Sequence, residues 1–147
     1  MIKDQQIVTK MFSLLNRLKV EERRILDEIR IFVGKNQKNK EIIVQSLIEQ
    51  LNLSKGLMRL RCYFVIDIIL KNYKNYHLLL EKELIKRFAK DLASFEKSKE
   101  LKVKMLKVFL SWEQTISISA LKKMISEYYR VYKQVDSIAN PFSGPLS

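Results

Sequence analysis

The chain has 147 residues, of which 47% are hydrophobic and 30% are charged. Single domains commonly run to about 100–150 residues, so this composition predicts one folded domain and excludes intrinsic disorder for most of the chain. Lys and Arg number 28 against 16 Asp and Glu, which gives a net charge of +12. A charge of this size favours an anionic partner such as nucleic acid, acidic lipid or a phosphopeptide.

The sequence is poor in the residues that build catalytic and metal centres. Its one cysteine, Cys62, cannot form an internal disulfide, which favours an intracellular setting. No stretch has the length of a membrane span, and the N-terminus lacks the apolar core of a signal peptide. One His and one Cys cannot form a common zinc site, and Gly34, Gly56 and Gly144 lie too far apart for a phosphate-binding loop. We therefore expect no enzymatic activity, no cofactor and no metal.

Helix breakers are rare, since no Gly or Pro falls between Gly56 and Pro141, and this absence predicts an all-helical fold. Apolar residues at helical spacing predict a first helix over 7–18 and a second over 25–33, with Gly34 as the C-cap of the second.

Five or six more helices are expected after the polar loop KNQKNK. Asn39 is predicted to cap the third helix and Ser54 the fourth, which runs to about Tyr73. Within the fourth, the stretch CYFVIDIIL is apolar around its circumference except for Asp67, which predicts the central helix of the domain. The remaining helices are predicted over 76–93, 98–112 and 117–133. We expect a domain over residues 1–135 and a flexible C-terminal tail over 136–147, where both prolines lie.

Asp67 is the outlier of the fourth helix. A carboxylate among apolar side chains is costly unless it is hydrogen-bonded or paired, and Lys71 stands at the i+4 position that suits an ion pair. Two interpretations stay open: a structural ion pair, or an acceptor that faces a groove and binds a ligand hydroxyl or amide. The segment from Lys55 to Lys107 carries 14 basic and 6 acidic residues, so most of the net charge lies there.

The stretch LRCYFVIDIILKN, residues 60–72, resembles the signature of the CTD-interacting domain, a helical module that binds the heptad-repeat tail of RNA polymerase II. Six residues are identical to that signature: Leu60, Ile66, Asp67, Ile69, Lys71 and Asn72. The later segments NYHLLLEKELIKRF and ELKVKMLKVFLSWE are similar to later helices of the family, and the order covers most of residues 5–133.

The resemblance implies a right-handed superhelix of about seven to eight helices, like the VHS and ENTH α-solenoids, with a groove for a peptide β-turn. It implies that Asp67 accepts a hydrogen bond from the heptad tyrosine and that Lys107, five residues before Trp112, binds a phosphoserine. The candidate peptide-binding residues are Phe64, Asp67, Ile68, Lys71, Asn72 and Arg23. The candidate phosphate-binding residues are Lys107 and Lys104.

Three departures from the family pattern affect this site. Phe64 replaces a usual Tyr and Ile68 a usual Ser, so the groove is expected to be more apolar. Residues 20–23 replace a Phe-Asn-Ser-Arg-like stretch, and Glu21 and Glu22 disfavour a nearby phosphate. Lys107 supplies a point charge, which recognises phosphate less selectively than the fork of an arginine.

The leading hypothesis is a nuclear, monomeric adaptor that binds the phosphorylated polymerase tail and couples it to mRNA 3′-end processing or transcription termination, without a membrane. One alternative is a VHS- or ENTH-like trafficking module that binds acidic peptides or anionic lipids. Another is RNA binding through the basic surface, as an accessory electrostatic activity. Neither His77 nor Cys62 stands in a catalytic arrangement, and Cys62 is expected in the core.

Overall fold

The computed structural model describes residues 2–18 and 22–132, with side chains described for 4–18 and 23–131. All regular structure in these ranges is helical, which confirms the predicted all-α class. The α-helices are α1 (Ile2–Arg17), α2 (Glu22–Lys35), α3 (Lys40–Leu53), α4 (Gly56–Asn72), α5 (His77–Ala93), α6 (Lys99–Leu110) and α7 (Ile118–Tyr132). Two short 3₁₀ turns, η1 (Gln37–Asn39) and η2 (Lys74–Tyr76), precede α3 and α5. The predicted roles of Val20, Glu21, the Glu22 side chain and the tail over 136–147 lie outside the described part.

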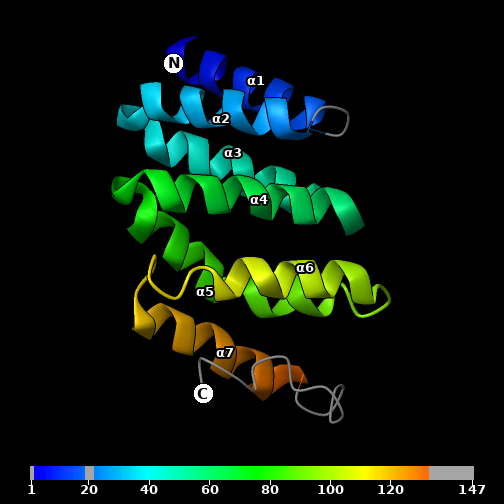
Figure 1. Ribbon diagram of the computed structural model, residues 1–147. Helices are drawn as coiled ribbons and strands as arrows, with labels where there is room; N and C mark the ends of the chain where they lie inside the picture. The colour runs from blue at the N-terminus through cyan, green and yellow to red at the C-terminus, as the bar shows by residue number, and fades with distance from the viewer. Residues whose placement is uncertain (1, 19–21, 133–147) are drawn as a thin grey trace. The chain divides into compact units, whose positions relative to one another are not determined.

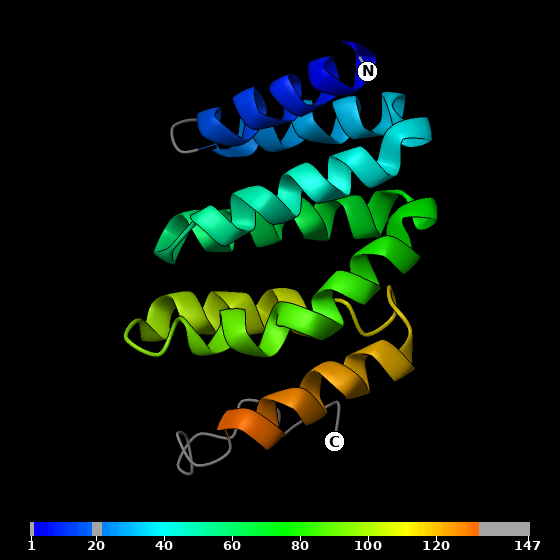
Figure 2. The same ribbon diagram turned by 180° about the vertical axis from the view of Figure 1, so that it is seen from behind.

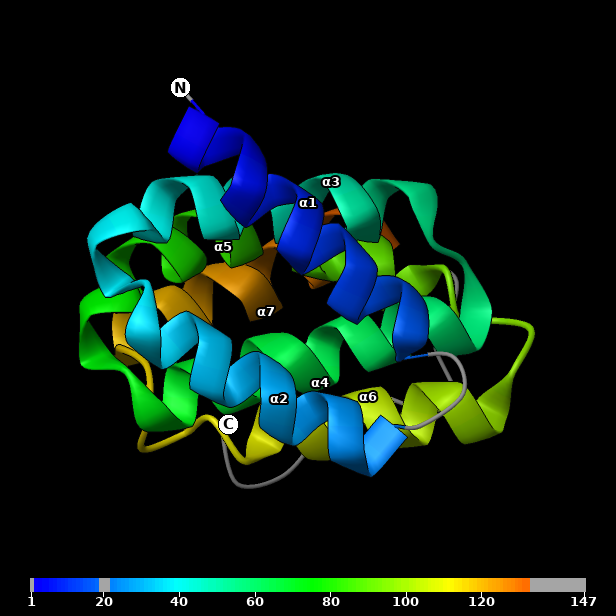
Figure 3. The same ribbon diagram turned by 90° about the horizontal axis from the view of Figure 1, so that it is seen from above.

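The chain divides into two compact units, Met1–Leu80 and Glu81–Ser147, and the boundary falls inside α5. In the first unit α1 packs against α3, and α2 packs against α4 (Figures 1 and 2). Figure 3 shows α1 and α3 along one side of this unit and α2 and α4 along the other. Apolar residues from all four helices are fully buried between them, among them Met11, Leu15, Ile25, Ile29, Leu47, Ile66 and Ile69. Burial of this apolar surface is the main force that holds the helices together.

Two helix ends differ from the sequence-based predictions. Ser54 does not cap the start of α4; it follows the end of α3, where its hydroxyl donates to the Gln50 carbonyl at 2.6 Å. Helix α4 begins at Gly56, whose φ of +55° is a left-handed conformation that glycine adopts at low cost. Asn39 precedes α3 as predicted, but its side chain makes no capping hydrogen bond.

Gly34 lies inside α2 and is not its C-cap, so that prediction was wrong. The reason for a glycine here is the close approach of Tyr73. A Cβ atom on residue 34 would lie 2.9 Å from Cζ of Tyr73, which is inside van der Waals contact. The Tyr73 hydroxyl thereby reaches α2 and donates to the Arg30 carbonyl at 2.7 Å.

The second unit contains an aromatic cluster between α5 and α6, which lie side by side in Figures 1 and 2. Phe88 of α5 stacks on Phe109 of α6 with ring centroids 4.6 Å apart, and Trp112 contacts both rings. All three side chains are fully buried.

Serine side chains fix the starts of two helices in this unit. Ser98 caps α6 by accepting a hydrogen bond from the Leu101 amide at 3.3 Å. Ser117 accepts from the Ala120 amide at 3.1 Å and donates to Glu81 of α5 at 2.9 Å, which ties the start of α7 to α5. None of the helices in the described residues combines the length and the apolar character needed to span a bilayer.

Candidate peptide-binding pocket

A pocket of about 860 Å³ lies in the first unit, with lining residues from α2 and α4. Its lining consists of Arg23, Arg24, Leu26, Asp27, Arg30, Phe64 and Ile68. We call it the arginine pocket. Its volume falls in the range of ordinary ligand sites. Three residues predicted to bind peptide, Arg23, Phe64 and Ile68, come together in it.

One wall of the arginine pocket is apolar. Phe64 and Ile68 stand one turn apart on α4, and both are half-buried. Helix α4 buries Val65, Ile66 and Ile69 in the core, so Phe64 and Ile68 occupy the part of its circumference that faces the pocket. Phe64 and Ile68 therefore give this wall an apolar surface suited to a proline or an aromatic ring.

The other wall is formed by α2 and is cationic. The apolar stripe of α2 faces the core. Arg23, Asp27 and Arg30, at spacings of four and three residues, therefore lie on the pocket side. Arg30 Nη2 and Nε lie 2.7 and 3.2 Å from one oxygen of Asp27. The hydrogen bond to Asp27, together with its charge, raises the pKa of the Arg30 guanidinium. Arg30 is thus held in place, and Asp27 offsets one of the positive charges.

The remaining arginines of the pocket differ in their surroundings. Arg24 Nε lies 3.6 Å from Glu28, a carboxylate that also accepts hydrogen bonds from Arg17 of α1 at 3.1 and 3.4 Å. Arg23 is exposed and has no ion-pair partner among the side chains that the structure describes. Because the lining holds three guanidinium groups and one carboxylate, the pocket attracts anions, and Arg23 is its most available donor.

Asp67 forms the predicted ion pair with Lys71, whose Nζ lies 2.9 Å from Oδ1. The Asp67 side chain remains 20% exposed and precedes Ile68 of the pocket wall, although Asp67 itself does not line the pocket. Asn72 donates from Nδ2 to the Ile68 carbonyl at 2.7 Å, at the last turn of α4. Of the four α4 candidates beyond Phe64, one lines the pocket and three make contacts within their own helix.

The candidate phosphate-binding lysines belong to α6, in the second unit. Lys104 Nζ lies 3.4 Å from Glu100, and both side chains are exposed. Lys107 is exposed and has no ion-pair partner among the described side chains. Neither lysine lines the arginine pocket.

The sequence interpretation missed Arg24, Leu26, Asp27 and Arg30. Part of the signal was present in the spacing: positions 23, 27 and 30 lie four and three residues apart on α2, opposite the stripe that was assigned to the core. Of these, Arg24, Asp27 and Arg30 are charged residues on the exposed side of the helix that packs against α4, so charge on that side was the available signal.

Within residues 2–18 and 22–132, no group of three or more His, Cys, Asp or Glu side chains is arranged to hold a metal ion. His77 begins α5, where its Nε2 lies 2.6 Å from the Leu70 carbonyl oxygen, and Cys62 is fully buried. Comparison with protein-family models, with curated proteins and with solved structures found no match.

Proposed function

We propose that this chain is a CTD-interacting domain that binds the phosphorylated heptad-repeat tail of RNA polymerase II. The observation that carries the proposal is the arginine pocket, which gathers Arg23, Phe64 and Ile68 beside the signature residue Asp67. In this proposal the chain is a nuclear, monomeric adaptor whose helices form a right-handed superhelix, and it couples the tail to mRNA 3′-end processing or transcription termination.

The apolar wall suits the heptad Tyr-Ser-Pro-Thr-Ser-Pro-Ser. Its prolines and its tyrosine ring pack on Phe64 and Ile68, since both are half-buried and face the pocket. Asp67, whose side chain is 20% exposed, then accepts a hydrogen bond from the tyrosine hydroxyl. The peptide folds a turn as it binds, and this ordering offsets part of the contact energy.

The cationic wall supplies the contact to phosphate. Guanidinium groups bind phosphate through two parallel N–H donors, which gives more geometric selectivity than an ammonium group. Arg23 is available for this contact, whereas Arg30 is bound to Asp27. The proposal therefore assigns phosphate binding to Arg23 in addition to Lys107, the residue that the family resemblance implies.

The proposal is tested by fluorescence anisotropy with two-repeat heptad peptides, either unphosphorylated or phosphorylated at position two, five or seven. We expect binding that weakens as salt is added, because the pocket and the chain are both cationic. Lys107→Ala should reduce the preference for phosphorylated peptides and leave the plain peptide unaffected. Vesicles that contain phosphoinositides should not capture the protein; capture of the protein without any peptide binding would favour the trafficking alternative.

A further inference from the structure

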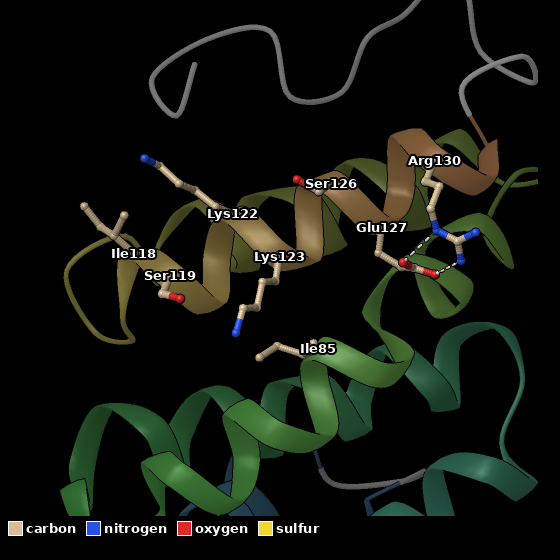
Figure 4. Close-up of a pocket in the computed structure, with 8 residues that line it drawn as sticks. All are labelled: Ile85, Ile118, Ser119, Lys122, Lys123, Ser126, Glu127 and Arg130. Carbon is tan, nitrogen blue, oxygen red and sulfur yellow. Dashed lines mark hydrogen bonds and ion pairs between the residues drawn. The ribbon is translucent and has the colours of Figure 1, made fainter.

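A second surface lies on α7, contained in the second unit and sharing no lining residue with the arginine pocket. A groove of about 690 Å³ is lined by one residue of α5 and seven of α7: Ile85, Ile118, Ser119, Lys122, Lys123, Ser126, Glu127 and Arg130. Figure 4 shows these side chains, with Ile85 on α5 and the others along α7. We call this surface the α7 groove.

The helical pattern of α7 explains why these residues are available. Ala120, Met124 and Tyr128, spaced by four residues, are buried together with Leu121. The opposite side of the helix carries the serines and lysines of the groove, and Lys122 and Lys123 are both exposed. The α7 groove is therefore formed by a regular element and not by a loop.

The groove carries excess positive charge. Arg130 donates to Glu127 at 2.6 and 3.1 Å, and this hydrogen bond lowers the pKa of the Glu127 carboxyl, so the two charges offset each other. Lys122 and Lys123 have no ion-pair partner among the described side chains. In Figure 4 Lys123 extends toward α5 beside Ile85, and Lys122 extends away from α5. One ammonium group is thus available on each of two sides of the helix.

Aliphatic side chains accompany this charge. Ile118 at the start of α7 is 62% exposed, and Ile85 faces the groove from α5. An exposed isoleucine next to unpaired lysines combines apolar contact with electrostatic attraction, the combination that recognises acidic peptides with an aliphatic anchor.

We propose that the α7 groove binds an acidic peptide segment of a partner protein. Its carboxylates pair with Lys122 and Lys123, and an aliphatic side chain packs on Ile118 and Ile85. RNA fits less well, because the lining holds no aromatic ring on which a base could stack. Residues 133–147 of the chain itself carry one Lys and one Asp, so charge gives them no preference for the groove. This surface would let the adaptor hold a second partner while the arginine pocket holds the polymerase tail.

The test uses the full chain and fluorescein-labelled peptides. The probe is a short peptide of aspartates and glutamates interrupted by leucines. Its counterparts have Asn and Gln in place of the acids, or Ala in place of the leucines. We expect the acidic leucine peptide to bind, the neutral counterpart not to bind, and the alanine counterpart to bind several-fold more weakly.

Charge-reversed variants locate the site. The double variant Lys122→Glu, Lys123→Glu should lower the affinity by about tenfold or more. The matched control, Lys97→Glu with Lys99→Glu, makes the same charge change at two exposed lysines of the same unit that do not line the groove. It should lower the affinity by no more than about threefold, through long-range attraction alone. Ile118→Ser, at an exposed position that folding does not require, should weaken binding several-fold with the charge unchanged.

Three results would overturn the proposal. Equal losses in the two double variants would show generic electrostatics, and no binding of the acidic leucine peptide at low salt would remove the site. Oligouridylate binding that depends on Lys122 and Lys123, with no peptide binding, would make the groove a nucleic-acid surface. The Lys122→Glu, Lys123→Glu variant should bind heptad peptides with an affinity lowered by no more than about threefold, so this proposal and the polymerase-tail proposal can fail separately.

Discussion

Tyr73 lies against Gly34 on α2, the helix that also carries Arg30 of the arginine pocket. The Tyr73 hydroxyl donates to the carbonyl of Arg30, whose side chain lines the pocket, and Gly34 gives the tyrosine ring the space it needs. A glycine inside a helix costs about 1 kcal/mol relative to alanine. Glycine is still favoured at position 34, because a larger residue would displace Tyr73.

Gly34→Ala should therefore lower the free energy of unfolding by about 1–3 kcal/mol, the usual cost of overpacking, despite the better helix propensity of alanine. In a Tyr73→Ala background the same change should be stabilising by about 1 kcal/mol, since only the helix propensity remains. Urea unfolding of the unchanged chain, the two single variants and the double variant measures both effects. A stabilising Gly34→Ala in the otherwise unchanged chain would contradict the steric account.

We expect the buried phenol of Tyr76 to make the fold less stable at alkaline pH. Burial, followed by the charges of Tyr73 and Glu41, raises the pKa of Tyr76 to about 12, and its hydroxyl donates to the Val33 carbonyl at 3.3 Å. A phenol whose pKa is higher in the folded than in the unfolded chain contributes stability below pH 10, and this contribution is lost between about pH 10 and 12. The free energy of unfolding should fall over that window, and less steeply in Tyr76→Phe. If the free energy of unfolding had the same pH profile in both proteins, Tyr76 would be excluded as the cause of the loss of stability.

At the scale of elements, α4 has a structural role and, in our proposal, a binding role as well. Its buried residues hold the first unit together, while Phe64, Asp67 and Ile68 remain partly accessible. The sequence predicted a helix over this segment, which the structure confirms, and the i+4 spacing indicated the ion pair of Asp67 with Lys71 as one of two interpretations. Both follow from local periodicity, which a single sequence contains.

Asp67→Asn separates the two interpretations of that carboxylate. An i,i+4 ion pair with an exposed lysine contributes only about 0.3–0.5 kcal/mol, so the free energy of unfolding should change little. Binding of every heptad peptide should weaken by about tenfold, because an acceptor for the tyrosine hydroxyl is altered. Urea unfolding and fluorescence anisotropy measure the two quantities. A large loss of stability with unchanged binding would assign Asp67 a structural role only.

Other elements were predicted less well, for physical reasons. Gly34 and Ser54 are residues that cap helices in many proteins, but here a tyrosine from another helix decides the role of Gly34, and Gly56 decides where α4 begins. The arginine pocket depends on which face of α2 meets α4. Such a pairing of helices is set by tertiary packing, which the spacing within one helix does not contain.

At the scale of the whole molecule, the positive net charge can be related to two particular surfaces. The net charge of +12 indicated an anionic partner of unspecified kind. Each of the two units carries one cationic surface with aliphatic or aromatic residues, the arginine pocket in the first and the α7 groove in the second. In our proposals the first binds the phosphorylated heptad tail and the second an acidic segment of another protein, as an adaptor requires.

The most direct test of the central proposal is the affinity of the chain for a two-repeat heptad peptide, phosphorylated and plain, compared between Arg23→Glu and Lys55→Glu. Both residues are exposed in the first unit, but only Arg23 lines the arginine pocket. We predict that Arg23→Glu weakens binding of a phosphorylated peptide by about tenfold, and that Lys55→Glu changes it by no more than about threefold. No binding of any heptad peptide at low salt, or equal losses in the two variants, would contradict the assignment of this pocket to the polymerase tail.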